Sequence, residues 1–246
     1  MVTWTFVELD NVSSTQTVAK GLAAMGAKEG TTVVAKSQSS GLGRMGRSWI
    51  SPEGGLYMSF VLRPGAIRRP ELVTLVAALA VTEGIKRATS LAPTIRWPND
   101  VMLNGKKLAG VNAEAQSFRG EVTQMVVGIG VDCNTPAPEL KPLEGEATSI
   151  AQELGRRVEI SEVKHAILDA FSFLYEQWKQ GRDLSGIWRE KVATIGNLVL
   201  VKLKTEEDPF SGVAREVDRD GNLSVARGGE TATVRPEDLE WLREQT

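Results

Sequence analysis

The stretch RWPNDVMLNGKKLAG, residues 96–110, is the part of this sequence that says most about its fold. Asn104-Gly105 is a strong signal for a two-residue hairpin turn, because both central residues of such a turn need positive φ. The flanking residues are therefore predicted to form paired antiparallel strands that return Lys107 toward Asn99 and Asp100. An Asp, an Asn and a Lys brought together suit a site for ATP and a carboxylate, in which Asp can hold Mg²⁺. The alternative is a hairpin with ordinary surface lysines, which fits Lys106 better than Lys107.

A second informative stretch is GLGRMGRSW, residues 41–49. It formally matches the dinucleotide fingerprint G-x-G-x-x-G, but the residues that follow will not form the helix which that motif requires. Residues 38–55 are predicted to be a long, polar, glycine-rich loop. Arg44 and Arg47 lie between its glycines and offer guanidinium donors for a phosphate or a carboxylate. A solvated surface loop is the alternative interpretation.

The remaining pattern predicts an α/β (α+β) fold with a mixed, mostly antiparallel sheet. Strands are expected at residues 4–9, 31–37, 56–62, 111–115 and 122–131, and helices at 14–25, 70–88, 161–178 and 186–195. Residues 135–148 are rich in Pro and Glu and are expected to form a surface loop. After Gly196, four short strands separated by turn residues predict a small SH3-like β-barrel. Two domains are expected, a mixed α/β domain at 1–190 and the all-β barrel domain at 191–246.

Composition excludes several classes of protein. Lys and Arg number 29 against 31 Asp and Glu, a net charge of −2, so nucleic-acid binding would need a local basic patch. The single Cys133 excludes an intrachain disulfide and multi-cysteine metal sites, and the single His165 excludes a histidine-built zinc site. The sequence shows no signal peptide and no apolar run long enough to span a membrane. A soluble, cytoplasmic protein is expected.

Taken together, the motifs resemble those of the biotin protein ligases. The resemblance covers essentially the whole chain and rests on Ser14-Thr15-Gln16, residues 38–49, residues 96–110 and residues 128–134. It implies a ligase that activates biotin with ATP to biotinyl-5′-AMP and transfers it to a lysine of a biotin carboxyl carrier domain. It also implies the monofunctional form without an N-terminal DNA-binding domain, because the Ser-Thr motif already begins at residue 14.

The resemblance also implies roles for individual residues. Biotin binding falls to Ser14, Thr15, Gln16, Gln38, Leu42, Gly43, Arg44, Lys107 and Gly110. ATP or adenylate binding falls to Arg44, Arg47, Trp49, Asn99, Lys107, Asp132 and Asn134. Catalysis is assigned to Lys107, Arg44 and Asp100, with Mg²⁺ expected to accompany the ATP phosphates. Backbone groups and Ser, Thr and Gln side chains suit the neutral ureido ring, and the cations suit two reacting anions.

Four positions depart from the family pattern: Gln16 and Asp132 replace the usual Asn, Leu42 often corresponds to Arg, and Arg96 replaces a common Lys. Two rival functions remain open, a lipoate or octanoate protein ligase of the same broad fold and a non-catalytic biotin-binding regulator. The second predicts loss of the basic catalytic residue, yet Lys107 is present. The expected partner is a biotin carboxyl carrier protein or domain, with neither nucleic acid nor membrane, and a homodimer is left open.

Overall fold

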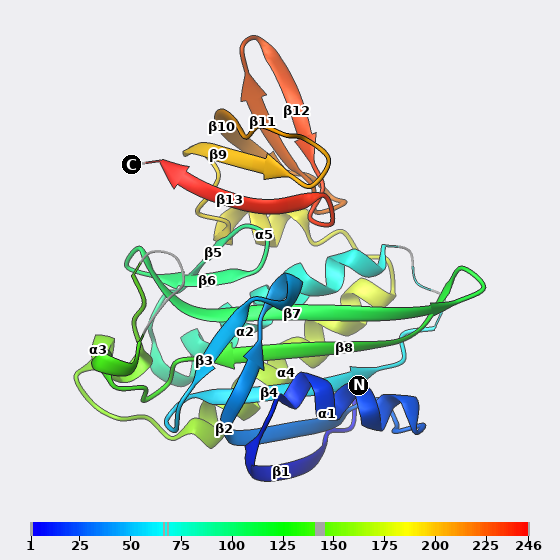
Figure 1. Ribbon diagram of the computed structural model, residues 1–246, viewed down its shortest axis with the longest axis vertical. Coiled ribbons are helices and arrows are strands. Elements are labelled where there is room, and N and C mark those ends of the chain that lie inside the picture. Colours follow the sequence, from blue (N-terminus) through cyan, green and yellow to red (C-terminus); the bar gives the residue numbers. More distant parts are fainter. Residues whose placement is uncertain (1, 66, 68, 141–145, 246) are drawn as a thin grey trace.

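The computed structural model describes residues 2–65, 67, 69–140 and 146–245, which form two β-sheets and a set of helices (Figure 1). The strands of the large sheet are β1 (Thr5–Val12), β2 (Thr31–Leu42), β3 (Ser48–Ser51), β4 (Leu56–Leu62), β5 (Thr94–Arg96), β6 (Asp100–Leu103), β7 (Lys106–Phe118) and β8 (Glu121–Val131). Their order is β1-β2-β4-β8-β7-β6-β5, with β3 added on β2. The β1–β2 pair is parallel and the other pairs are antiparallel, which confirms the predicted sheet type.

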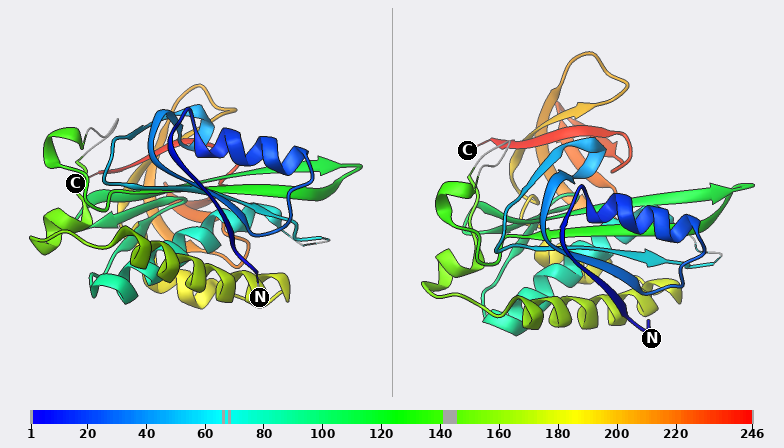
Figure 2. Two further views of the ribbon diagram at one scale, coloured as in Figure 1. Left: turned by 90° about the horizontal axis from the view of Figure 1, so that it is seen from below. Right: turned by 60° about the horizontal axis from the view of Figure 1, so that its bottom comes forward.

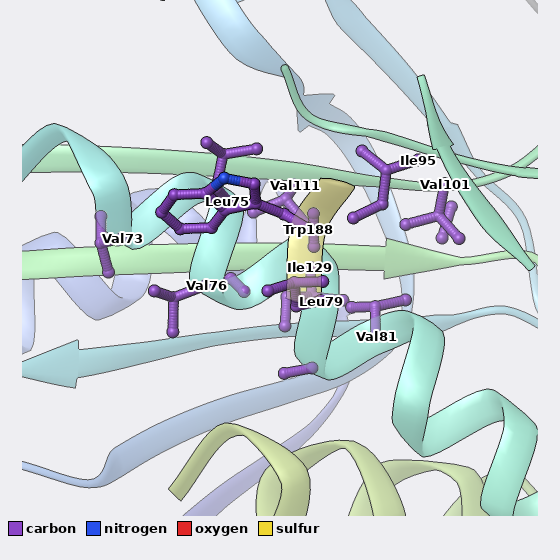
Figure 3. Close-up of a cluster of buried hydrophobic side chains, with 14 of the residues drawn as sticks. Val73, Leu75, Val76, Leu79, Val81, Ile95, Val101, Val111, Ile129 and Trp188 are labelled. Atoms are coloured by element: carbon purple, nitrogen blue, oxygen red, sulfur yellow. The ribbon is translucent and has the colours of Figure 1, made fainter. Parts of the chain in front are cut away.

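Helices cover both faces of this sheet. α1 (Thr15–Ala24) lies on one face, and α2 (Val73–Thr89) and α4 (Ile160–Lys179) pack together on the other (Figure 2). The long helix α2 is apolar along nearly its whole length because it is buried between the sheet and α4, where its side chains meet Ile129 and Val111 (Figure 3). Two shorter helices, α3 (Ile150–Leu154) and α5 (Ser185–Lys191), follow the sheet.

Alternation along the central strands separates the two faces chemically. On β4, Met58 and Phe60 face the α2–α4 core, whereas Ser59, between them, lies against α1. On β8, Val127 and Ile129 face the same core, so Gly128 and Gly130 are on the α1 side. Around Ser59, Gly128 and Gly130 the α1 side of the sheet is therefore small and polar, and beside them α1 packs on a smaller hydrophobic cluster of Ala19, Ala23, Val33, Val61 and Val126.

A second, five-stranded antiparallel sheet follows the large sheet and its helices. Its strands are β9 (Leu198–Leu203), β10 (Phe210–Val217), β11 (Leu223–Arg227), β12 (Glu230–Val234) and β13 (Leu239–Gln245), in the order β12-β11-β10-β9-β13. Trp97, buried between β5 and β6, donates from Nε1 to the carbonyl oxygen of Gly221 at 3.0 Å and so connects the two sheets. The domain boundary at residue 190 stays a prediction.

The sequence patterns miss some elements. Residues 38–55 are not one loop: β2 continues through Leu42, and Gly41 pairs with Trp49 of β3, so the glycine-rich stretch is mostly a hairpin whose tip is a 3₁₀ turn at Arg44–Gly46. The prediction was wrong because the polar residues 38–41 have little strand propensity of their own and are held by β1 and β3. The helix expected at 186–195 ends at Lys191, and α3 and β13 were not predicted.

The predicted loop at 135–148 contains a 3₁₀ turn at Ala137–Glu139, and its residues 141–145 lie outside the described part of the chain. Over the described residues, no helix is both long enough and apolar enough to cross a lipid bilayer.

Candidate active site

A cavity of about 380 Å³ lies on the α1 side of the sheet. The β2–β3 hairpin crosses β7 and β8 at this point (Figure 1), and the N-terminus of α1 closes one end. The lining includes all but one of the residues that the sequence predicted: Ser14, Thr15, Gln16, Gln38, Leu42, Gly43, Arg44, Arg47, Trp49, Asn99, Asp100, Lys107, Gly110 and Asp132. Segments from four parts of the chain therefore meet at one site.

The end of the cavity beside α1 is polar and uncharged. Ser14 occupies the N-cap of α1, yet its hydroxyl makes no capping hydrogen bond. Gln38 of β2 caps the helix instead. Its Oε1 accepts hydrogen bonds from the Thr15 backbone N–H at 2.8 Å and from the Thr15 hydroxyl at 3.1 Å. The Ser14 hydroxyl is buried without a hydrogen-bond partner, and the neighbouring Ser59 hydroxyl pairs with Thr15 at 2.9 Å. This end thus offers a free hydroxyl to a neutral polar group.

The opposite end is cationic and is organised around Asp100. Its Oδ1 lies 2.7 Å from Lys107 Nζ and its Oδ2 lies 2.6 Å from Arg96 Nη2. Burial alone would raise the pKa of Asp100, but the two cations outweigh burial and hold the pKa below its usual value. The predicted return of Lys107 toward Asp100 is thus confirmed, and Asn104 and Gly105 of the hairpin turn both have positive φ.

The two arginines of the β2–β3 hairpin reach toward the C-terminal sheet. Arg44 donates from Nη2 to the carbonyl oxygen of Pro236 and, at 3.2 Å, to that of Leu239. Arg47 donates from Nη2 to the carbonyl oxygen of Glu240 at 3.0 Å. Burial, together with the nearby charge of Arg47, lowers the pKa of Arg44. The hairpin tip is therefore joined to the turn before β13 and to the first residues of β13.

The Trp49 indole packs against the backbone of Gly110 and Gly130, where a side chain would collide with it. A Cβ on Gly130 would lie 2.6 Å from Trp49 Nε1, and a Cβ on Gly110 would lie 2.9 Å from Trp49 Cζ3. These two glycines face each other across β7 and β8. Lys107 Nζ lies 5.3 Å from the centre of the indole, within range of a cation–π interaction. Gly128 lies in the same way against Gln16. The three glycines thus leave space on the α1 side of the sheet for Trp49, for Gln16 and for the cavity.

Asp132 ends β8 at the cavity, 7% exposed, and accepts a hydrogen bond from the Thr135 hydroxyl at 3.1 Å. Burial raises the pKa of Asp132 to about 7, with Thr135 and Lys107 acting in the opposite direction. The next residue, Cys133, is 0% exposed and belongs to the hydrophobic core.

Asn134 is the predicted residue that the structure does not bring to the cavity. Its amide donates to the Val158 carbonyl at 2.9 Å and accepts from the Val158 N–H at 2.9 Å, so both of its polar groups bind backbone. Asn99, by contrast, lines the cavity and donates to the Val111 carbonyl oxygen at 3.0 Å.

Sequence reasoning missed other lining residues. Ser59, Asn112, Gly128 and Gly130 were not predicted as site residues. The last two belong to a stretch that had been noted, but a glycine at a strand end has a plain structural interpretation. Only the pairing of β8 with β7 shows that they lie beneath Trp49 and Gln16. Among the described residues, no group of three or more His, Cys, Asp or Glu side chains could hold a metal ion.

Comparison with known proteins assigns the family. The model of the biotin/lipoate A/B protein ligase family matches residues 9–132. The bifunctional ligase/repressor BirA of Bacillus spizizenii is 36% identical over 219 residues, which cover 87% of this chain and 67% of that protein. The biotin–[acetyl-CoA-carboxylase] ligase of Paracoccus denitrificans is 34% identical over 209 residues, which cover 80% of this chain and 83% of that protein.

A solved structure extends the match to the whole fold. The biotin protein ligase of Aquifex aeolicus, in complex with biotin and ATP, has a TM-score of 0.84 at 27% identity and covers 98% of this chain and 99% of its own. The alignment thus includes both the catalytic sheet and the C-terminal sheet, and the chain belongs to the biotin/lipoate A/B protein ligase family as a biotin protein ligase.

Proposed function

We propose that this chain joins biotin to ATP, releasing pyrophosphate, and then transfers the biotinyl group from biotinyl-5′-AMP to a carrier lysine. The observation that carries the proposal is the single cavity with two chemically different ends. The free hydroxyl of Ser14 marks the uncharged end. Lys107 and Arg44 mark the cationic end. Biotin has the matching shape, with a neutral, polar ring at one end and a carboxylate at the other.

In the first step, a biotin carboxylate oxygen attacks the α-phosphorus of ATP. The new bond is an acyl phosphate, and the bond to the bridging oxygen breaks as pyrophosphate leaves. Both reactants are anions, so positive charge near the reacting atoms lowers the barrier. We assign this role to Lys107 and Arg44. Asp100 positions Lys107 through the 2.7 Å ion pair, and Arg96 holds the second oxygen of Asp100.

The nucleotide is proposed to lie over β7 and β8, beside Trp49, Asn99 and Asp132. Mg²⁺ bound to the triphosphate would neutralise part of the charge of its oxygens. Both oxygens of Asp100 already contact cations, and the described residues offer no metal-binding cluster, so we expect the phosphates rather than the protein to supply most ligands of the ion.

In the second step, an uncharged lysine amine attacks the acyl carbon of the adenylate. An amide forms, AMP leaves with the electron pair of the broken C–O bond, and the amine gives up a proton. We propose that the acceptor is the biotin carboxyl carrier domain of a biotin-dependent carboxylase, since two of the relatives are named acetyl-CoA-carboxylase ligases. ATP as a substrate makes the cytoplasm the proposed place of reaction.

The test is ATP–pyrophosphate exchange measured in parallel with biotin, lipoate and octanoate, followed by biotin transfer to a carrier domain. Exchange should depend on biotin, and only the carrier that retains its acceptor lysine should become labelled. Exchange that is faster with lipoate or octanoate than with biotin would assign the chain to the rival ligases. Tight biotin binding without any exchange would assign it to the non-catalytic regulators.

A further inference from the structure

The side-chain amide of Gln16 is held from outside the cavity by a carboxylate on β7. Gln16 Nε2 donates to Glu114 Oε1 at 3.1 Å and to the Val126 carbonyl oxygen at 3.2 Å. The second oxygen of Glu114 forms an ion pair with Lys20 Nζ at 2.6 Å. Gln16 is 2% exposed, whereas the Glu114 and Lys20 side chains are 40% and 51% exposed. A surface ion pair is thus connected to a buried amide in the cavity lining.

This arrangement fixes which end of the amide is available. An ionised carboxylate and a carbonyl oxygen can only accept hydrogen bonds, so Gln16 must turn its NH₂ group toward Glu114 and Val126. Its Oε1 then lies on the other side, against Gly128, where a Cβ would approach it to 2.6 Å. This oxygen is buried without a hydrogen-bond partner. A buried acceptor left without a donor is costly, and the described residues around it provide none.

We propose that Glu114, supported by Lys20, is a positioning residue that presents Gln16 Oε1 as an acceptor for a ring N–H of the ligand. The inference rests on the proposed function and deepens it, because it names the feature that selects the head group. A cyclic urea carries two N–H donors. A dithiolane ring or an alkyl chain carries none and would leave the oxygen unpaired. Gln16 therefore determines specificity for the head group. Glu114 keeps the Gln16 amide from rotating by half a turn, which would exchange its oxygen and its NH₂ group.

A purely structural role is the competing explanation. Gln16 and Lys20 are on α1, and Glu114 is on β7, so the same contacts could merely fasten the helix to the sheet. The two explanations differ in the ligand atoms that matter. A fastening role changes stability and affinity for every ligand alike, whereas an acceptor role changes affinity only for ligands that have the N–H in question.

The experiment measures binding of biotin and of its two analogues in which one or the other ureido N–H is replaced by an oxygen atom. Titration calorimetry is run with the wild-type chain, Gln16→Met, Glu114→Gln and Glu8→Gln. Gln16→Met keeps the length of the side chain and removes the acceptor. Glu114→Gln can offer an NH₂ group and so no longer dictates the orientation of the amide. Glu8, which pairs with Lys164 at 3.3 Å, is the matched control for loss of a helix–strand ion pair.

For the wild-type chain, one of the two analogues should bind about 30-fold more weakly than biotin, the order expected when a hydrogen bond is replaced by two opposed acceptors. That ratio should fall to within about threefold in Gln16→Met and to an intermediate value in Glu114→Gln, and stay at the wild-type value in Glu8→Gln. Thermal unfolding is measured in parallel, and the ratio should change whether or not the midpoint does.

Equal analogue ratios in the wild-type chain and Gln16→Met would overturn the role of Gln16, and an unchanged ratio in Glu114→Gln would overturn the positioning role of Glu114. In both cases, biotin binding by the wild-type chain leaves the proposed function standing. A wild-type chain that binds no biotin would overturn the inference together with the proposed function.

Discussion

Lys107 is a single side chain in contact with two others at the cationic end of the cavity. It pairs with Asp100, lies near the Trp49 indole and carries the charge that we place between the two reacting anions. Because Asp100 holds it through a hydrogen-bonded ion pair, its ammonium group is already in position before the substrates react. Such prior positioning is what makes an electrostatic group effective in catalysis.

Replacing Lys107 by Met should therefore slow adenylate formation by about 10²–10³-fold and weaken biotin binding less. Biotin-dependent ATP–pyrophosphate exchange measures the first quantity and calorimetry the second. Lys106→Met is the matched control, because Lys106 is the adjacent lysine and its nearest acidic partner, Glu146, is 3.7 Å away. Exchange by Lys107→Met within about twofold of wild type would contradict the assignment.

Asp132 should leave a signature in the stability of the folded chain. Burial raises its pKa to about 7, from about 3.9 for an ordinary Asp, so the folded state binds the proton more tightly than the unfolded state. Between the unfolded and the folded pKa of Asp132, the unfolded chain therefore binds fewer protons than the folded chain. The contribution of Asp132 to stability is therefore greatest below about pH 4 and is lost as the pH rises to about 7.

Asp132→Asn removes this titration and retains an oxygen for the Thr135 hydroxyl, so its stability should exceed that of wild type at pH 8 and approach it at pH 4. Urea unfolding at several pH values measures the difference. Two stability curves that stay parallel from pH 4 to pH 8 would show that the Asp132 carboxyl titrates near its ordinary value.

At the scale of elements, the sequence predicts best what short-range rules determine. Asn104-Gly105 predicted the turn that brings Lys107 to Asp100, and the pattern of residues 70–88 predicted the helix that the structure shows as α2. The hairpin of β2 and β3 escaped prediction because residues 38–41 are strands only through their partners. Asn134 was placed at the nucleotide by resemblance, although Val158, 24 positions away, uses its amide.

The glycines of β7 and β8 show the same limit. Their meaning depends on which side chain lies above them, and that is a property of strand register and of the β2–β3 hairpin, not of the strand itself. Pairing places Gly110 opposite Gly130, which makes one flat patch out of two separate strands.

Filling that patch should displace Trp49. In Gly130→Ala, the new Cβ would lie 2.6 Å from Trp49 Nε1, so the indole has to move. We expect ATP to bind about tenfold more weakly, as for a lost aromatic contact of about 1.4 kcal/mol, and biotin binding to change less. Tryptophan emission should also shift. Gly21→Ala in α1, where no atom lies within 4 Å of the added Cβ, is the control. Unchanged ATP affinity and tryptophan emission in Gly130→Ala would show that these glycines do not position Trp49 for ATP.

At the scale of the whole molecule, the β2–β3 hairpin contacts the C-terminal sheet through Arg44 and Arg47. Arg44 uses Nη2 for the carbonyl oxygens of Pro236 and Leu239. A guanidinium group has five N–H donors in a planar fork, so donors remain for a phosphate while one nitrogen is held. The C-terminal sheet is thus placed to orient an arginine that lines the cavity.

Arg44→Gly removes this connection and leaves Lys107 in place, so biotinyl-5′-AMP should still form but dissociate faster. The activated ester then reaches water and the lysines of bystander proteins. The measurements are the dissociation rate of preformed adenylate and biotin labelling of an added protein without a carrier domain. Met45→Gly, next along the hairpin tip, controls for a more flexible backbone. If Arg44→Gly retained the adenylate as well as wild type and caused no bystander labelling, Arg44 would not be the residue that holds the adenylate.

The folded surface offers no reactive thiol, because Cys133 is the single cysteine of the sequence and is 0% exposed. Burial also raises the pKa of its thiol, and maleimides react with the thiolate. Met45 is 48% exposed at the hairpin tip, so Met45→Cys would place a reactive thiol there. A dye could be attached to it without first replacing Cys133. A fluorophore at that single position would report how the surroundings of the hairpin tip change when ligands bind, on the otherwise unmodified chain.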